Sequence, residues 1–516
     1  MPRVVIVGLD GVPWSVINRL YEDGVVDVLP EIAKEGAYGT LTSIIPPYTV
    51  PAWTSMATGV NPGKHGAYST HVPQPDYSLR LLTSGDVLYP RVYECLSMCG
   101  MESVVVNLPL SYPPRLFRGV MVSDWLYPKL KVYPEEESAF LRGYSQPDPL
   151  WALYSPIGYS RTLLEGLNGR IGAIKRLFQN VNWDMFFVVF SETDFLLHKD
   201  YENIINGGNS HPSRNVFHKI DNFVGWILDR LPQDCLLLVV SDHGFAKYRC
   251  VVHVNSLLRN LGLITLKAFR RGTTDFSGRL PIPRFAYRYI YRSRNLRRLV
   301  GPVLDYLGFN SASLYLRIPA SKSYAFMLPD HFGIYINSRD IFSNWLLKKR
   351  EAVSIKRKLI RLLRRIKNPK NGNHLFSAVY SREDVFSGPN VHRIPHIILV
   401  PSAPCWMDHE IAGAPVEVRT HIDHSLTGMV VLYGCDVKAG TRLKDASLLD
   451  ITPTILHYLG LSVDSRADGR PLLEAFKLSS AVRQRPVRFG DYLSRWRAAL
   501  KFKLLREKIK HREKHA

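Results

Sequence analysis

Residues 4–11 read VVIVGLDG, an unbroken apolar run that ends in the acidic residue Asp10 before a glycine. A run rich in Val and Ile, with no polar residue alternating, is typical of a strand that is buried on both faces. Similar runs recur at residues 103–107, 185–190, 236–242, 331–337, 396–402 and 429–434. Helical patterns lie between many of them, for example at residues 14–36, 215–231 and 447–459. This alternation predicts an α/β fold with a mostly parallel central sheet and helices on both faces.

Two stretches break this rhythm. Residues 266–325 are rich in Arg, Tyr and Pro and read as a basic insertion, which we interpret as a cap. Residues 477–516 follow the last core element and end in a basic helical pattern. We therefore predict one α/β domain, residues 1–476, with an inserted cap at 266–325 and a basic helical tail at 477–516.

The basic charge of the chain is concentrated in two places. The net charge is +22, and residues 267–298 hold ten basic residues and one acid, a net of +9. Residues 482–516 hold twelve basic residues and three acids, also a net of +9. The rest of the chain is close to balanced, so nucleic acid or an anionic membrane, if either is a partner, would meet these two segments.

The tail carries apolar residues at helical spacing among its basic ones: Leu493, Trp496, Leu500 and Leu504. Such a stripe either docks on an anionic membrane or partner, or packs on the core with its charges solvated, and we favour packing. A second basic helix is expected at residues 345–367. Its buried face is predicted to comprise Ile355, Leu359, Leu362 and Ile366.

No apolar run reaches the roughly 18 residues needed to span a bilayer, and no signal-peptide pattern precedes the first strand. We therefore expect a cytoplasmic protein, or one peripheral to a membrane. The six cysteines form no CxxC pair, and in a chain of 516 residues they indicate reduced thiols and not a disulfide framework.

Acidic and histidine side chains follow several predicted strands where each strand ends: Asp10, then Asp194 and His198, then Asp242 and His243. A further histidine, His424, lies just before the strand at 429–434. Taken alone, an Asp in such a place is more often a helix cap or turn residue than a ligand, and a lone His is more often a surface or satisfied core side chain. Because ligands gather at the carboxyl ends of parallel strands, we expect the six to meet at one edge of the sheet. Carboxylates gathered in one place repel each other unless a cation lies between them, and mixed Asp and His ligands suit zinc or another borderline divalent ion.

The segment 46–66 reads PPYTVPAWTSMATGVNPGKHG and supplies candidate nucleophiles. Its Pro, Gly and Thr content predicts a loop that leads into a short helix. A hydroxyl in such a turn can face a metal, lose its proton and attack phosphorus. Three hydroxyl residues fit this role equally on composition: Thr49, Thr54 and Ser55. The GKH at 63–65 lacks the spacing and the following Ser or Thr of a phosphate-binding P-loop.

The order of these motifs resembles the alkaline phosphatase superfamily, in particular its type I phosphodiesterase/nucleotide pyrophosphatase branch. The resemblance extends over most of the core and rests on the segments at 4–11, 48–66, 191–200, 239–245, 423–434 and 450–472. It implies that residues 1–476 form an alkaline phosphatase-like catalytic domain. It further implies a metal-dependent phosphohydrolase, either a phosphodiesterase or a phosphomonoesterase, that acts on a small phosphate ester.

The resemblance also implies the roles of the site residues. One divalent ion is expected to be held by Asp10, Asp242 and His243, and a second by Asp194, His198 and His424. Thr49 matches the family's nucleophilic threonine and is expected to contact the first ion. The two ions are expected to be zinc, with manganese or iron as alternatives. His421 is an alternative ligand to His424, which we prefer because its distance to Gly428 and the next strand matches the family.

One departure from the family pattern concerns the substrate. Nucleotide pyrophosphatases have an Asn after the Thr-x-Pro step, where this chain has Ala52, so a nucleotide substrate is less expected. A sulfatase is not favoured, because residues 49–53 lack the Cys or Ser and the Arg of its motif. Two alternatives stay open: a phosphotransferase or phosphomutase on the same core, and a nucleic-acid- or membrane-binding protein on an inactive hydrolase core.

Overall fold

The computed structural model describes residues 2–127, 129–149, 154–207, 211–265, 320–368 and 372–515. A sheet of nine strands lies at its centre, in the order β20-β2-β19-β9-β1-β8-β5-β6-β7. Five neighbouring strands run parallel: β9 (Cys235–Val240), β1 (Arg3–Leu9), β8 (Met185–Phe190), β5 (Ser103–Val106) and β6 (Gly119–Val122). At one side β19 (Thr427–Tyr433) is antiparallel to both β9 and β2 (Ala37–Thr42), and β2 is parallel to β20 (Thr441–Ser447). At the other, β7 (Val132–Tyr133) is antiparallel to β6.

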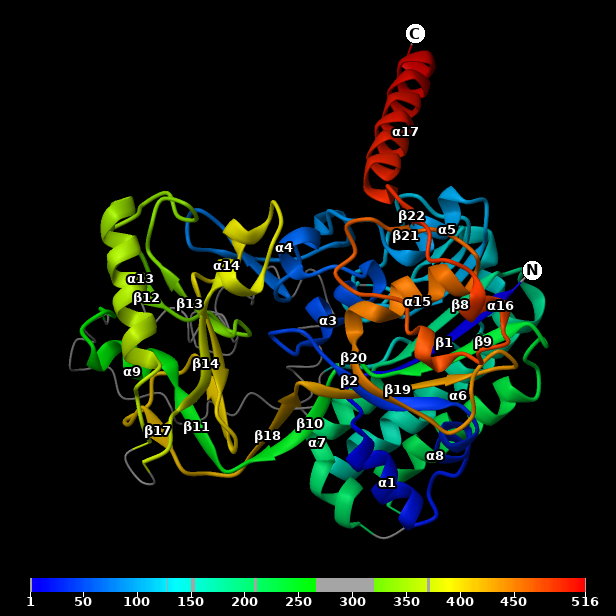
Figure 1. Cartoon of the computed structure of the whole chain (residues 1–516), viewed down its shortest axis with the longest axis horizontal. Coiled ribbons are helices and arrows are strands. Elements are labelled where there is room, and N and C mark those ends of the chain that lie inside the picture. Colours follow the sequence, from blue (N-terminus) through cyan, green and yellow to red (C-terminus); the bar gives the residue numbers. More distant parts are fainter. Residues whose placement is uncertain are drawn as a thin grey trace.

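Helices cover both faces of this sheet (Figure 1). The alternation of side chains along β1 explains this arrangement. Val5 and Val7 belong to one apolar cluster, whereas Val4 and Ile6 belong to another on the opposite face. The first face is covered by α1 (Trp14–Glu22), α2 (Val28–Glu35), α6 (Pro156–Asn180), α7 (Glu192–Asn206) and α8 (Pro212–Leu228). The second face is covered by α3 (Thr49–Thr58), α5 (Val92–Met98) and α15 (Ile451–Tyr458). The predicted α/β fold with a mostly parallel sheet is therefore confirmed.

A smaller lobe extends from the core on the ribbon formed by β10 (Gly244–Tyr248) and β18 (His421–Ser425) (Figure 1). It has an apolar core of its own. It contains a four-stranded sheet of β12 (Ala325–Phe326), β13 (Gly333–Ile336), β15 (Ile397–Pro401) and β14 (Phe376–Ser381). A second sheet pairs β11 (Cys250–His253) with β16 (Cys405–Asp408) and β17 (Val416–Glu417). Within the described residues, the α-helices of the lobe are α9 (Val254–Asn260), α13 (Lys349–Leu363) and α14 (Arg382–Val385).

Two strands were assigned to the wrong sheet at the level of sequence. The runs at 331–337 and 396–402 are strands, but they pair antiparallel in the smaller lobe and do not continue the central sheet. A short apolar run shows that a strand is buried, not which sheet it joins. Of the predicted basic insertion, residues 266–319 lie outside the described residues.

The expectation of six reduced cysteines is wrong for one pair. Cys250 and Cys405 form a disulfide between the first residues of β11 and β16. The other four cysteines, Cys95, Cys99, Cys235 and Cys435, are free thiols. A separation of 155 residues leaves no spacing signal from which the pair could have been read.

Other short α-helices and strands among the described residues are α4 (Pro62–His65), α16 (Ala481–Gln484), β3 (His71–Pro73), β4 (Leu79–Leu81), β21 (Val463–Asp464) and β22 (Phe489–Gly490). Because β22 pairs with β21, part of the predicted tail at 477–516 contacts the core. The tail that stands apart is α17 (Tyr492–His515), which projects from the body (Figure 1). Among the described helices, none is both long and apolar enough to cross a bilayer.

The packing predicted for the two basic helices holds in part. On α17, Leu493 and Trp496 are buried and Leu500 is partly buried, but Leu504 is 58% exposed. On α13, Leu359 is buried as expected and Ile355 is partly buried. Ile366 is also partly buried, but it lies beyond the end of the helix. Leu362 instead is 41% exposed, and Leu363 takes its place in the core. The spacing of four from 355 to 359 continues to 363, so the helix buries that face.

Candidate metal centre

The parallel pairing of β1 and β9 brings their carboxyl ends together. Asp10 follows β1 directly, and Asp242 and His243 follow β9 after one residue. The turn after β1 is held against β9, because the Gly11 N–H donates to Asp242 Oδ1 at 3.2 Å and the Val12 N–H to Ser241 Oγ at 2.7 Å. The two strand ends therefore deliver three polar side chains to one place.

A helix and the ribbon supply the other three side chains. Asp194 and His198 lie one turn apart at the start of α7, which follows β8. The Thr193 hydroxyl donates to the Asp10 backbone oxygen at 2.6 Å and ties this helix to the end of β1. His424 comes from β18, which pairs with β10, and β10 begins directly after His243. All six predicted ligand residues are thus placed at one edge of the central sheet.

The six side chains form one continuous cluster. His243 Nε2 lies 3.3 Å from Asp242 Oδ2 and 3.6 Å from Asp10 Oδ1. On the other side, His424 Nε2 lies 3.1 Å from Asp194 Oδ1 and 2.9 Å from His198 Nε2. The two halves meet where His243 Nε2 lies 4.0 Å from Asp194 Oδ1. One ligand atom each of Asp10, Asp242 and His243 lies close enough to the others to share an ion. On the other side, two overlapping groups meet this condition: Asp194 and His424 with His243, and His198 and His424 with Asp423.

The donor atoms of this cluster fit divalent cations. Asp10 and Asp242 are fully buried, and the Oδ2 atom of each has no hydrogen-bond partner. The His243 Nδ1–H donates to the Gly244 backbone oxygen at 3.2 Å, which leaves the lone pair of Nε2 directed into the cluster. Unpartnered buried carboxylate oxygens beside imidazole nitrogens are the ligand set that zinc and similar ions prefer.

The pKa shifts of the three carboxyl groups also indicate a site for cations. Burial, followed by the charges of Asp242 and Asp194, raises the pKa of Asp10 well above its usual value. Burial also raises the pKa of Asp242 to about 7. Burial opposes ionisation of Asp194 too, but His198 and His424 outweigh it and lower the pKa of that carboxyl. Three buried carboxylates this close cannot all ionise unless cations lie among them.

One of the three candidate hydroxyls faces the cluster. Thr49 is the first residue of α3, and its Oγ1 lies 3.5 Å from Asp10 Oδ1 and 3.4 Å from His243 Nε2. The Thr54 hydroxyl donates instead to the Val50 backbone oxygen at 2.7 Å. Of these hydroxyls, the geometry therefore favours Thr49 as a nucleophile at the cluster.

Ser55 is engaged elsewhere, by a histidine of the same segment. Its Oγ lies 2.8 Å from His65 Nε2, while His65 Nδ1 accepts the Ala67 N–H at 3.1 Å. Burial lowers the pKa of His65 to about 3, so the ring is neutral and Nε2 carries its proton. The ring therefore donates to Ser55, and it holds α3 and α4 together without activating the hydroxyl.

The structure also separates the two histidines of β18. His421 Nε2 lies 3.0 Å from Asp423 Oδ2, whereas His424 points into the cluster. Asp423, which sequence reasoning missed, has a carboxylate within reach of His198 and His424. Tyr48 was missed as well: its ring meets His424 edge-on at 5.3 Å and stacks on Phe332 at the same distance. Only their adjacency to His424 and Thr49 in the sequence marks them.

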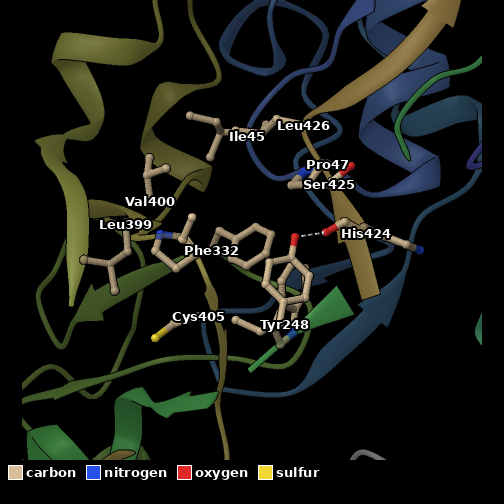
Figure 2. Close-up of a pocket in the computed structure, with 13 residues that line it drawn as sticks. Ile45, Pro47, Tyr248, Phe332, Leu399, Val400, Cys405, His424, Ser425 and Leu426 are labelled. Carbon is tan, nitrogen blue, oxygen red and sulfur yellow. Dashed lines mark hydrogen bonds between the residues drawn. The ribbon is translucent and has the colours of Figure 1, made fainter. Parts of the chain in front are cut away.

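A cavity of about 170 Å³ lies beside the ribbon, between β18 and the smaller lobe (Figure 2). Its lining is mostly apolar and includes Tyr248, Phe332 and Trp406. His424 is the one cluster residue in the lining, and its ring points away from the cavity. The Tyr248 hydroxyl donates to the His424 backbone oxygen at 2.6 Å, so the cavity wall helps to fix the position of His424.

A sequence profile described as type I phosphodiesterase/nucleotide pyrophosphatase matches residues 4–426, a span that includes Thr49 and all six ligand residues. Among solved structures, the chain is similar to phosphonoacetate hydrolase from Sinorhizobium meliloti 1021 in complex with phosphonoformate. That match has 17% identity and a TM-score of 0.53, and it covers 87% of this chain and 94% of that one. The chain is also similar to the murine ectonucleotide pyrophosphatase/phosphodiesterase 5, with 13% identity, a TM-score of 0.50, and coverage of 92% and 100%. At these identities the likeness shows a shared fold. No curated protein sequence matches the chain.

Proposed function

Because this chain belongs to the type I phosphodiesterase/nucleotide pyrophosphatase family, a family of phosphoric ester hydrolases, we propose that it is a two-metal hydrolase with Thr49 as its nucleophile. One observation carries the proposal: six buried or partly buried Asp and His side chains converge from four separate parts of the chain, and the Thr49 hydroxyl lies beside two of them, Asp10 and His243. The fold alone does not require that convergence, and a protein that only binds a partner has no use for it.

We assign the ligands in two sets. Asp10, Asp242 and His243 hold the ion next to Thr49, and Asp194, His198 and His424 hold the other. Mixed carboxylate and imidazole ligands favour zinc, with manganese or iron as alternatives. Two divalent cations in these positions would lower the pKa of the Thr49 hydroxyl and neutralise the negative charge of the phosphoryl group.

The residues of the chain then perform a double displacement. The Thr49 oxygen attacks phosphorus, and the bond between phosphorus and the leaving alcohol breaks. Water cleaves the resulting phosphothreonine, which releases the phosphate product and restores the hydroxyl. Thr49 is the first residue of α3, so the positive end of that helix faces the phosphoryl oxygens. Our candidate for the role of the family's Asn, for which this chain has Ala52, is the backbone N–H of Val50 in the first turn of α3.

The substrate proposed is a small phosphate ester. The solved hydrolase with the same fold binds a small phosphonate, which makes phosphonates a second class worth testing. We further propose that residues 1–476, with the smaller lobe, form the catalytic domain and that residues 477–516, which include α17, are an appended basic tail. A cytoplasmic location stays a prediction, against which the Cys250–Cys405 disulfide counts, because such bonds are typical of oxidising compartments.

The test is a pair of variants at one position. Thr49→Ala is expected to lower kcat against a nitrophenyl phosphate ester at least about a thousandfold, because no atom remains to attack phosphorus. Its content of zinc, manganese and iron, measured by mass spectrometry, should equal that of the wild type. Thr49→Ser keeps a hydroxyl and should retain far more activity. Full activity in the alanine variant, or wild-type protein without bound metal, would refute the assignment.

A further inference from the structure

The projecting helix α17 carries two apolar faces, and the core covers only one. Leu493 and Trp496 are buried against the surface that includes Tyr89 and Val60. The Trp496 indole N–H donates to the buried Glu94 carboxylate at 3.1 Å, and the Arg115 guanidinium lies 4.5 Å above its ring. These contacts hold the first turns of the helix firmly to the body.

The second face meets solvent. Phe502, Leu505 and Ile509 follow the spacing of three and four that places residues on one side of a helix. They are 64%, 50% and 54% exposed. The C-terminal part of α17 projects away from the body (Figure 1). A single helix in water is marginal by itself, so a projecting helix with large apolar side chains is most stable when something covers that face.

The charge of α17 indicates which partner binds its exposed apolar face. Residues 495–514 contain nine Lys or Arg and two Glu, a net of +7. A second copy of the helix would bring like charges side by side. Nucleic acid would satisfy the basic residues but would leave the three apolar side chains in water. An anionic bilayer satisfies both, since the apolar groups enter beneath the headgroups while Lys and Arg meet the phosphates.

We propose that α17 anchors this protein peripherally to anionic phospholipid membranes, with Phe502, Leu505 and Ile509 inserted at the interface. The anchor carries none of the proposed metal ligands, and the inference does not depend on the proposed function. Each basic residue at an anionic surface strengthens binding about fivefold, and salt near 0.5 M shortens the screening length to about 4 Å and removes most of that gain.

The experiment is co-sedimentation of the full chain with vesicles. The wild type is expected to bind phosphatidylcholine vesicles that contain phosphatidylglycerol at least about tenfold more tightly than pure phosphatidylcholine vesicles, and to lose most of that binding in high salt. The triple variant Phe502→Ser/Leu505→Ser/Ile509→Ser should bind the anionic vesicles at least about tenfold more weakly. The matched control is Leu478→Ser/Phe489→Ser, which removes two well-exposed apolar residues outside α17 and should bind like the wild type.

Three outcomes overturn the proposal. The first is unchanged vesicle binding in the triple serine variant whose circular dichroism and thermal unfolding match the wild type. The second is a wild-type dimer in sedimentation velocity that the serine changes dissociate, with no vesicle binding by either protein; that result assigns the face to a second copy. The third is tight binding to duplex DNA that the serine changes leave intact, in the absence of vesicle binding.

Discussion

The histidine and carboxylate side chains around His253 in the smaller lobe differ from those at the edge of the central sheet in whether each polar atom has a hydrogen-bond partner. In the smaller lobe, His253 on β11 is buried, with Nδ1 2.8 Å from Asp408 Oδ1 and Nε2 3.3 Å from Glu417 Oε2. Each ring nitrogen therefore has a carboxylate partner from a neighbouring strand, and Arg419 in turn donates to Glu417 at 3.0 Å. This group is complete without an ion.

At the edge of the central sheet, the carboxylates of the cluster are only partly hydrogen-bonded. Asp10 and Asp242 each keep one buried oxygen without a partner, and the Nε2 atoms of His198 and His424 face each other at 2.9 Å. Distance alone would nominate His253, Asp408 and Glu410 as a further metal site. The proposed metal centre is therefore distinguished by buried carboxylate oxygens without hydrogen-bond partners, and not by the mere proximity of Asp and His.

Removal of metal should separate the two groups most strongly. Chelation by EDTA is expected to abolish hydrolysis, and zinc or manganese should restore it. Stability should fall by several kcal/mol, because an ion present at a hundred times its Kd stabilises the folded state by about 2.7 kcal/mol per site. Urea unfolding with and without metal measures the change. A His253→Gln variant should show the same dependence on metal, and a smaller dependence there would mean that its group binds an ion too.

Of these two groups, only the one at the edge of the central sheet could be predicted from the sequence. Asp10, Asp194 and Asp242 follow strands of the central sheet, so parallel pairing alone was enough to expect them at one edge. The partners of His253 gave no such signal, because Asp408 and Glu417 are more than 150 residues away in the chain and join it through a sheet that the apolar runs did not reveal. The Cys250–Cys405 pair lies in the same two strands and was missed for the same reason.

The orientation of individual side chains could be predicted only in part from the sequence. Thr49, Thr54 and Ser55 were equivalent by composition, and the direction of each hydroxyl depends on where α3 begins and on the contact with His65. Likewise Leu362 and Leu363 are adjacent apolar residues, and helix rotation decides which one is buried. Contacts made by tertiary packing, which no local pattern encodes, settled both cases.

Loss of the imidazole in the smaller lobe should destabilise the protein without touching the metal centre. His253→Gln leaves the Asp408 carboxylate with a weaker partner and is expected to cost about 1–3 kcal/mol of the free energy of unfolding. Urea unfolding measures this, and metal content should be unchanged. Glu417→Gln, at a half-exposed position, should cost less. Equal losses from the two variants would contradict the view that the Asp408 contact dominates.

In metal-free protein, removal of one carboxylate charge from the metal centre should raise the free energy of unfolding, whereas His253→Gln lowers it. Asp10→Asn abolishes one ligand, so metal binding and activity should be lost. In EDTA, however, the variant is expected to be more stable than the wild type by about 1 kcal/mol, because it removes a buried like charge. Burial and the neighbouring carboxylates raise the pKa of Asp10, so its ionisation is resisted in the folded state and the gain should grow as the pH rises. A less stable metal-free variant at neutral pH would show that the cluster satisfies its own charges after all.

The smallest expected effect is the pH dependence of the complete group in the smaller lobe. The hydrogen bond to Asp408, helped by its charge and by Glu417, raises the pKa of His253 in the folded protein despite burial. The imidazolium is therefore stabilised by folding, so its contribution is full below the unfolded pKa of about 6.5 and is lost as the pH rises through the folded pKa. The difference in unfolding free energy between the wild type and His253→Gln, measured in EDTA at a series of pH values, should shrink from mildly acidic to alkaline conditions. Since the same chelated background is present in both proteins, titration of the metal centre cancels. A difference that stays constant with pH would mean that His253 is neutral throughout, and that its two carboxylates are held by other donors.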